Sequence, residues 1–266
     1  TGQWSAKAIK EASRYCEVNI AATSEDKNFS YAPQQSQLKL NPEAAYVHYT
    51  PNETIGGVEF DYIPETGSVP LVADFSSSIL SRELDISKFA LIYAGAQKNI
   101  GPAGLCIVIV REDLLGETIV GTPTAMNYKV AADNDSMYNT PATYSWYLAG
   151  LVFQWLKQQG GVSAMAEIND RKAKKLYDFI DQSDFYANPV ALENRSCMNV
   201  PFTLEDASFD KAFLQGADEA GLLNLKGHRS VGGMRASIYN AVPEEAVDAL
   251  IEYMRSFAQK NAQKNA

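Results

Sequence analysis

The chain has 266 residues, enough for one large domain or for a large and a small domain, each with its own apolar core. Its composition, 46% hydrophobic and 21% charged, is typical of a soluble globular protein, and the absence of a long apolar run argues against a membrane role. The net charge of −9 and the pI near 4.8 argue against nucleic-acid binding, which needs clustered lysine and arginine.

Cysteine and histidine are scarce. The three cysteines, Cys16, Cys106 and Cys197, form an odd set without paired spacing, which predicts reduced thiols and a cytoplasmic protein. The two histidines, His48 and His228, belong to no Cys/His cluster with metal-ligand spacing, so we predict no metal site.

The chain begins "TGQWSAKAIK", without an initiator methionine or a signal-peptide pattern, so we expect this start to be a cut one. Helical spacing of apolar residues predicts a helix over residues 5–16, capped by Ser5. After a polar loop, four short apolar runs occupy residues 44–50, 69–77, 89–97 and 104–112. These runs predict strands buried on both faces, as in the central sheet of an α/β domain.

The pattern changes after Pro141. Residues 142–161 predict a long apolar helix that ends at the Gly160–Gly161 pair and crosses the core or an interface, and residues 162–183 predict an amphipathic helix. Strands and helices then alternate over residues 197–204, 209–221, 233–240 and 243–261, as in a compact second unit. We therefore predict a large domain over residues 1–160 and a small C-terminal α+β domain over residues 161–266.

Lys98 is the first residue whose position suggests chemistry. Only Gln97 separates it from the apolar run "FALIYAGA", and Asp74 ends another apolar run, where an unpaired carboxylate would be costly to bury. The two residues could form a partly buried ion pair. Alternatively, a desolvated lysine can form a Schiff base with an aldehyde cofactor whose pyridinium nitrogen an aspartate holds protonated.

Five ordered motifs decide between these interpretations: "HYTPNETIGG", "ADFSSSILSR", "IYAGAQKNIGPAGLCIVIVREDLLG", "MYNTPATYSWYLAGLVFQWL" and "GHRSVGGMRASIYNA". Together they resemble the phosphoserine aminotransferase family, and the match runs from Trp4 almost to the C-terminus. The resemblance implies the aspartate aminotransferase fold (fold type I), with a mainly parallel central sheet flanked by helices. It also implies pyridoxal 5'-phosphate as the cofactor.

The resemblance assigns the cofactor-binding residues one by one. It makes Lys98 the Schiff-base lysine and proton carrier, Asp74 the partner of the pyridine nitrogen, and Thr54 the partner of the ring hydroxyl. It places Trp4 against the ring face and Gln97 at the cofactor phosphate. Without the resemblance, Trp4 would be interpreted as a core residue that anchors its helix.

Asn139 and Thr140 would reach the cofactor phosphate from the other subunit of a homodimer, according to the same resemblance. Their position just before Pro141 also suits them to cap the following helix, and the two roles are compatible. The active sites would then be shared across the dimer interface.

The resemblance assigns substrate binding to "GHRSVGGMR". Arg235 would bind the substrate α-carboxylate, while His228 and Arg229 would bind the substrate phosphate across the interface; the planar fork of arginine suits both anions. We interpret His48, within a strand-like run, as structural.

The implied reaction is reversible transamination of 3-phosphohydroxypyruvate with glutamate, giving O-phosphoserine and 2-oxoglutarate in serine biosynthesis, with 4-phosphohydroxythreonine of pyridoxine synthesis as a second substrate. A different pyridoxal-phosphate enzyme of the same fold is the alternative within this class. Family members also carry a region ahead of the stacking tryptophan that includes part of the cofactor-phosphate and substrate sites, and that region does not precede Trp4 here. An inactive fragment that keeps the fold but binds cofactor poorly is therefore the alternative outside this class.

Overall fold

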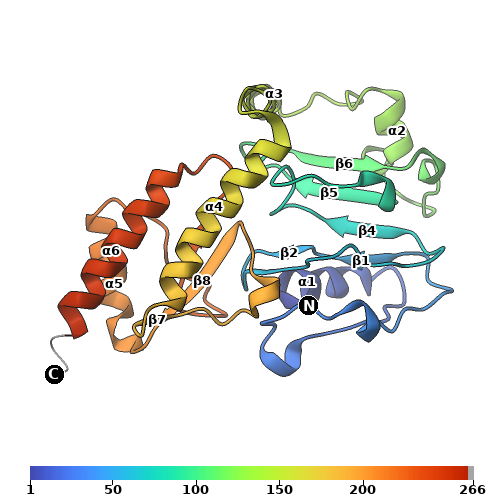
Figure 1. The fold of residues 1–266 in the computed structure, drawn as a ribbon. Coiled ribbons are helices and arrows are strands. Elements are labelled where there is room, and N and C mark those ends of the chain that lie inside the picture. The colour runs from blue at the N-terminus through green and yellow to red at the C-terminus, as the bar shows by residue number, and fades with distance from the viewer. Residues whose placement is uncertain (263–266) are drawn as a thin grey trace.

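Two larger sheets organise the fold of the computed structural model, which describes residues 1–262 (Figure 1). The first sheet has the order β1-β4-β5-β6, formed by Val47–Tyr49, Leu71–Asp74, Leu91–Gly95 and Cys106–Val110. β1, β4 and β5 are parallel, whereas β6 pairs with β5 in the antiparallel sense. The four predicted strands are therefore present, and the sheet is mainly parallel.

β6 departs from the expectation that every strand is buried on both faces. Cys106 and Ile109 on this strand are exposed, although β4 and β5 bury alternate residues such as Ala73 and Ile92. The physical reason is its place in the sheet, since within the described residues β6 has a neighbour on one side only. The apolar pattern of a strand does not reveal whether the strand lies at an edge.

α1 begins earlier than the sequence predicts. It spans Gly2–Ala12, so Ser5 lies within the helix and does not cap it. Instead, the carboxylate of Glu53 accepts the backbone N–H of Trp4 at 3.0 Å. Glu53 belongs to β2 (Asn52–Glu53), which forms a short antiparallel ribbon with β3 (Val58–Glu59) and lies against α1.

The Gly160–Gly161 pair breaks the helical path as predicted. α3 (Thr143–Gln158) ends just before it and α4 (Gly161–Asp181) begins at its second residue, with φ of +96° at Gly160. α3 does not cross the core of this chain, because it exposes a row of large side chains at Tyr144, Trp146, Tyr147, Leu151 and Phe153. A short helix, α2 (Tyr128–Asp133), precedes it.

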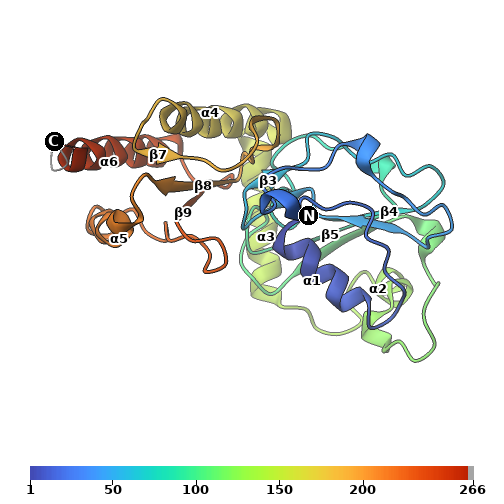
Figure 2. The same cartoon turned by 90° about the horizontal axis from the view of Figure 1, so that it is seen from below.

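The second sheet is antiparallel, with the order β7-β8-β9 formed by Tyr186–Ala187, Asn199–Leu204 and Met234–Ser237. α4 and α6 (Glu244–Ala262) run side by side over it, as Figure 2 shows. α5 (Asp210–Glu219) packs its Phe213 against Phe257 of α6, with the two ring centroids 5.1 Å apart.

Each sheet has its own apolar core. One cluster gathers residues between Ala32 and Ala149 around the first sheet, and the other gathers residues between Ala173 and Met254 around the second. Val190 is the exception, because it follows α4 in sequence but packs into the core of the first sheet. Two cores support domains over 1–160 and 161–266, and we keep that boundary as a proposal. Within residues 1–262, no helix is both long enough and apolar enough to cross a membrane.

Candidate functional site

Lys98 lies in a tight turn that follows β5. Its backbone N–H and that of Gly101 both donate to the carbonyl of Ala96, each at 2.8 Å. At Gly101 the φ angle is +155°, a backbone conformation that residues with a side chain rarely adopt, so glycine suits this position of the turn. The turn thereby directs the Lys98 side chain back toward the ends of the parallel strands.

The Lys98 amine donates to the hydroxyl of Thr54 at 2.8 Å. Burial lowers the pKa of Lys98 from 10.5 to about 8, and the positive charge of Arg235 adds to that effect, while Asp74 and Glu53 oppose it. Among the ion pairs of residues 1–262, none joins Lys98 to Asp74. The simple ion-pair interpretation is therefore wrong; instead, burial lowers the pKa of the amine toward neutral pH.

Asp74 lies at the end of β4 with its carboxylate held in place. Its Oδ1 accepts the backbone N–H of Ser76 at 3.0 Å and the Ser76 hydroxyl at 2.6 Å. The same hydroxyl accepts the backbone N–H of Gly95 at 3.0 Å, which ties the carboxylate to the start of the lysine turn. Ser76 therefore fixes the orientation of an acidic group next to Lys98.

His48 approaches the same carboxylate from β1. Its Nε2 lies 3.0 Å from the Tyr93 hydroxyl. Burial lowers the pKa of His48, although the charge of Asp74 acts in the opposite direction. Burial, and to a smaller extent the charge of Asp74, raises the pKa of Tyr93. The His48 and Tyr93 rings are therefore both neutral near pH 7. This arrangement fits the structural interpretation of His48.

Trp4 lies on α1 beside the lysine, with the Lys98 Nζ 6.0 Å from the centre of its ring. Trp4 as a whole residue is 38% exposed, and the Lys7 Nζ also lies near its ring, 4.1 Å from the ring centre. Glu53 was missed by the sequence analysis; its carboxylate is almost fully buried at the N-terminus of α1, and burial raises its pKa. The available signal was an acidic residue directly before Thr54 in the motif "NETI".

Arg235 lies on β9 and faces this cluster closely enough to lower the pKa of Lys98. Its Nε is buried without a hydrogen-bond partner among residues 1–262. A buried guanidinium N–H without an acceptor is costly, so this position suits an anionic ligand.

The remaining predicted residues are not brought into this cluster. Gln97 follows β5 and folds its amide back over Gly95. Asn139 and Thr140 lie on an exposed loop before α3, and Asn139 lines a crevice of about 420 Å³ beside α2 and β6. His228 and Arg229 lie in the turn before β9, where the His228 Nδ1 is 2.7 Å from the Ser230 hydroxyl.

Within residues 1–262, no group of three or more His, Cys, Asp or Glu side chains is placed to hold a metal ion. The residues that lie around the Lys98 amine are Trp4, Thr54, Asp74 and Arg235. Together they combine an amine of lowered pKa, an oriented carboxylate, an aromatic ring and a guanidinium whose Nε has no partner among residues 1–262. These groups can hold a flat anionic molecule and exchange a proton with it.

Comparisons with known proteins show which family the chain resembles. The model of the aminotransferase class-V family matches residues 1–250. The phosphoserine aminotransferase of Hahella chejuensis is 66% identical over 98% of this chain and 73% of its own length, and that of Pseudomonas putida is 63% identical over 98% and 72%. This chain thus spans about three-quarters of their length.

The solved structures agree as well. Phosphoserine aminotransferase from Bacillus circulans subsp. alkalophilus superimposes with a TM-score of 0.96 at 46% identity, covering 98% of this chain and 72% of that one. The pyridoxal-phosphate-bound phosphoserine aminotransferase from Trichomonas vaginalis gives 0.91 at 42% identity, covering 96% and 73%. An alanine–glyoxylate aminotransferase from Nostoc, at 14% identity and a TM-score of 0.78, over 96% of this chain and 72% of its own, shares the fold alone.

Proposed function

This chain belongs to the class-V aminotransferase family, and we propose that it catalyses the reversible transfer of an amino group between O-phosphoserine and 2-oxoglutarate. The products are 3-phosphohydroxypyruvate and glutamate, as in serine biosynthesis. The observation that carries the proposal is the Lys98 amine, which lies beside Thr54, Asp74 and Arg235 and whose pKa is lowered to about 8. The matched relatives carry the phosphoserine aminotransferase name, which favours this function over an inactive fragment or another reaction on the same fold.

The cofactor of the proposal is pyridoxal 5'-phosphate, and three features of the site fit it. The lowered pKa of Lys98 leaves a fraction of the amine neutral and nucleophilic near pH 7. Asp74 is oriented by Ser76 and can hold a ring nitrogen protonated. The ring of the half-exposed Trp4 offers a stacking face. When bound, this cofactor withdraws electrons and stabilises negative charge at the substrate α-carbon.

The residues of the chain then perform distinct tasks. Arg235 binds the substrate α-carboxylate, with its unpaired Nε–H as one donor, which orients the α-carbon. Lys98 Nζ, when neutral, would accept the proton from that carbon and pass it to the cofactor, and would carry it back when the reaction runs in reverse. The Thr54 hydroxyl keeps the amine within reach of the site. A pKa of about 8 places the amine close to working pH, which favours proton transfer in both directions.

A homodimer is part of the proposal. Gln97 would hold the cofactor phosphate within one subunit, and Asn139 and Thr140 would reach it from the other. His228 and Arg229 would bind the substrate phosphate across the same interface. The exposed aromatic row on α3, next to the loop that carries Asn139, supports a partner surface there. A cytoplasmic location and a second activity on 4-phosphohydroxythreonine complete the proposal.

Substrate selectivity tests this function. Initial rates with O-phosphoserine and with serine, each with 2-oxoglutarate as acceptor, should differ by at least about 100-fold in kcat/KM, because serine lacks the phosphate that His228 and Arg229 would bind through charge-assisted hydrogen bonds. Equal rates on the two substrates would contradict the assignment.

A further inference from the structure

The turn after β4 has an unusual hydrogen-bonding pattern at residues 79–81. Among residues 1–262, no backbone N–H donates to their three carbonyl groups. Instead, the side-chain amides of Asn99, Asn240 and Asn169 donate to them in that order, at 2.9, 2.9 and 3.0 Å. We call these three residues the asparagine seam.

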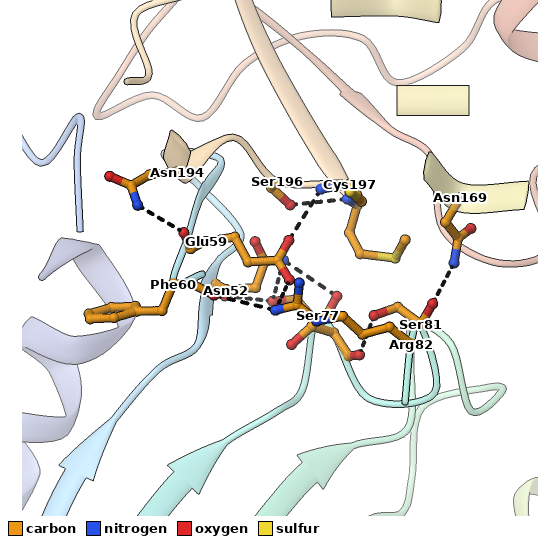
Figure 3. A network of polar contacts seen from close by, with 12 residues as sticks. Asn52, Glu59, Phe60, Ser77, Ser81, Arg82, Asn169, Asn194, Ser196 and Cys197 are labelled. Carbon is orange, nitrogen blue, oxygen red and sulfur yellow. Dashed lines mark hydrogen bonds and ion pairs between the residues drawn. The ribbon is translucent and has the colours of Figure 1, made fainter. Parts of the chain in front are cut away.

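The asparagine seam is buried and internally connected. Asn99, Asn169 and Asn240 are each exposed over 5% of their surface or less. The Asn99 Oδ1 accepts the backbone N–H of Asn240 at 3.0 Å, and the Asn169 amide also donates to the Asn240 Oδ1 at 2.9 Å. Figure 3 shows Asn169 reaching down to Ser81. The seam therefore links the lysine turn, α4 and the segment after β9.

Leu80, at the centre of the turn, has a φ angle of +61°. A leucine rarely adopts this left-handed conformation, which persists only where surrounding contacts impose it. Here the contacts that impose the conformation are hydrogen bonds from the side-chain amides of the seam, because no backbone N–H donates to these carbonyls among residues 1–262. The shape of the turn thus depends on the three asparagines.

The seam connects two parts of the proposed active site. Asn99 directly follows Lys98, and Asn240 lies five residues after Arg235, just beyond the end of β9. We propose that the asparagine seam is a positioning device that fixes the Lys98 amine relative to the Arg235 guanidinium. This inference rests on the proposed function, in which Arg235 holds the carboxylate attached to the carbon that Lys98 deprotonates. Because that carbon is one bond from the carboxylate, the separation of the two side chains sets the approach of the amine.

Asn99→Asp in the full-length protein tests the proposal. The variant keeps the shape and the acceptor for Asn240 but places an oxygen opposite the carbonyl of residue 79. Asn194→Asp is the matched control, because Asn194 is 4% exposed and its Oδ1 accepts a backbone N–H from Ala32 at 3.0 Å, outside the seam. Borohydride reduction establishes that cofactor is bound to Lys98 in each protein. Rapid-mixing kinetics with O-phosphoserine and its α-deuterated form then measure proton removal.

We expect Asn99→Asp to slow proton removal by about 100-fold, the usual effect of a misplacement near 1 Å, and to enlarge the deuterium isotope effect on turnover. Asn194→Asp should leave both quantities unchanged at comparable thermal stability. Equal rates and isotope effects in the two variants would overturn the proposal. If Asn99→Asp does not fold, Asn240→Ala is scored in the same way, since it removes only the side-chain bonds of that residue. A wild-type protein without transamination would instead overturn the proposed function on which the seam rests.

Discussion

The hydrogen bond between Lys98 and Thr54 makes a quantitative prediction for Thr54→Val. The Thr54 hydroxyl accepts from the Lys98 amine at 2.8 Å, and Thr54 is 8% exposed. A hydrogen bond to a charged group contributes about 1.5–3 kcal/mol, but a neutral amine can also bond the hydroxyl, so only part of this favours the charged form. If half of this free energy favours the charged form, the bond raises the pKa of Lys98 by roughly 0.5–1 unit, at 1.36 kcal/mol per unit.

Thr54→Val should therefore lower the pKa of Lys98 from about 8 by roughly 0.5–1 unit, since it removes an acceptor that favours the ammonium form. The assay is a pH titration of the lysine ¹³Cε signals in cofactor-free protein, with Lys98 assigned by its loss in Lys98→Met. Thr50→Val is the matched control, because the Thr50 hydroxyl is buried without a partner among residues 1–262. A pKa that rises in Thr54→Val, or falls equally in Thr50→Val, would refute this reasoning.

Three further predictions concern charged groups. Asp74→Asn should lower the pKa of Lys98, because the Asp74 charge raises it, and should reduce kcat by about 100-fold, measured by titration and initial rates. Lys172→Met should destabilise the fold by about 3 kcal/mol or more, measured by urea unfolding, since the buried Lys172 amine donates to three backbone carbonyls at 2.9–3.1 Å. Arg82→Ala should cost about 1–3 kcal/mol at pH 7, because it leaves the buried Glu59 carboxylate, 2.7 Å from the half-exposed Arg82 guanidinium, without its charged partner.

The pH dependence of Arg82→Ala follows from the same contact, drawn in Figure 3. Burial raises the pKa of Glu59 in the folded protein, although Arg82 opposes this. A carboxyl group whose folded pKa lies above its unfolded value binds a proton more tightly when folded, so folding gains stability as pH falls through the folded pKa. The unfolding free energy that Arg82→Ala loses relative to the wild type should therefore become smaller in mild acid. A loss that grows as the pH is lowered would contradict the assignment of this effect to Glu59.

The sequence predicted the elements because apolar periodicity carries most of that information. The four strands of the first sheet and the break at Gly160 follow directly from local pattern. The exposure of β6 and the start of α1 could not be predicted locally. The exposure of β6 depends on which strands lie beside it. The start of α1 depends on Glu53, which is 49 residues from Trp4 in sequence.

The residues of the site were likewise predicted only in part from the sequence. Lys98 and Asp74 were singled out by their positions after apolar runs, whereas Thr54, Trp4 and Arg235 were identified through the family resemblance. The structure brings these five residues together. The residues that support them were missed, because asparagine and serine in a sequence are usually surface residues and carry no periodic signal. Their roles come from contacts between distant segments, such as the asparagine seam, which only the folded chain creates.

We propose that Lys98 binds the cofactor covalently. Borohydride reduction of the purified protein, followed by peptide mass mapping, tests this bond. We expect a single pyridoxyl-phosphate adduct on the peptide that contains Lys98, and none in Lys98→Arg. An unmodified Lys98, or an adduct on another lysine such as Lys172, would contradict it.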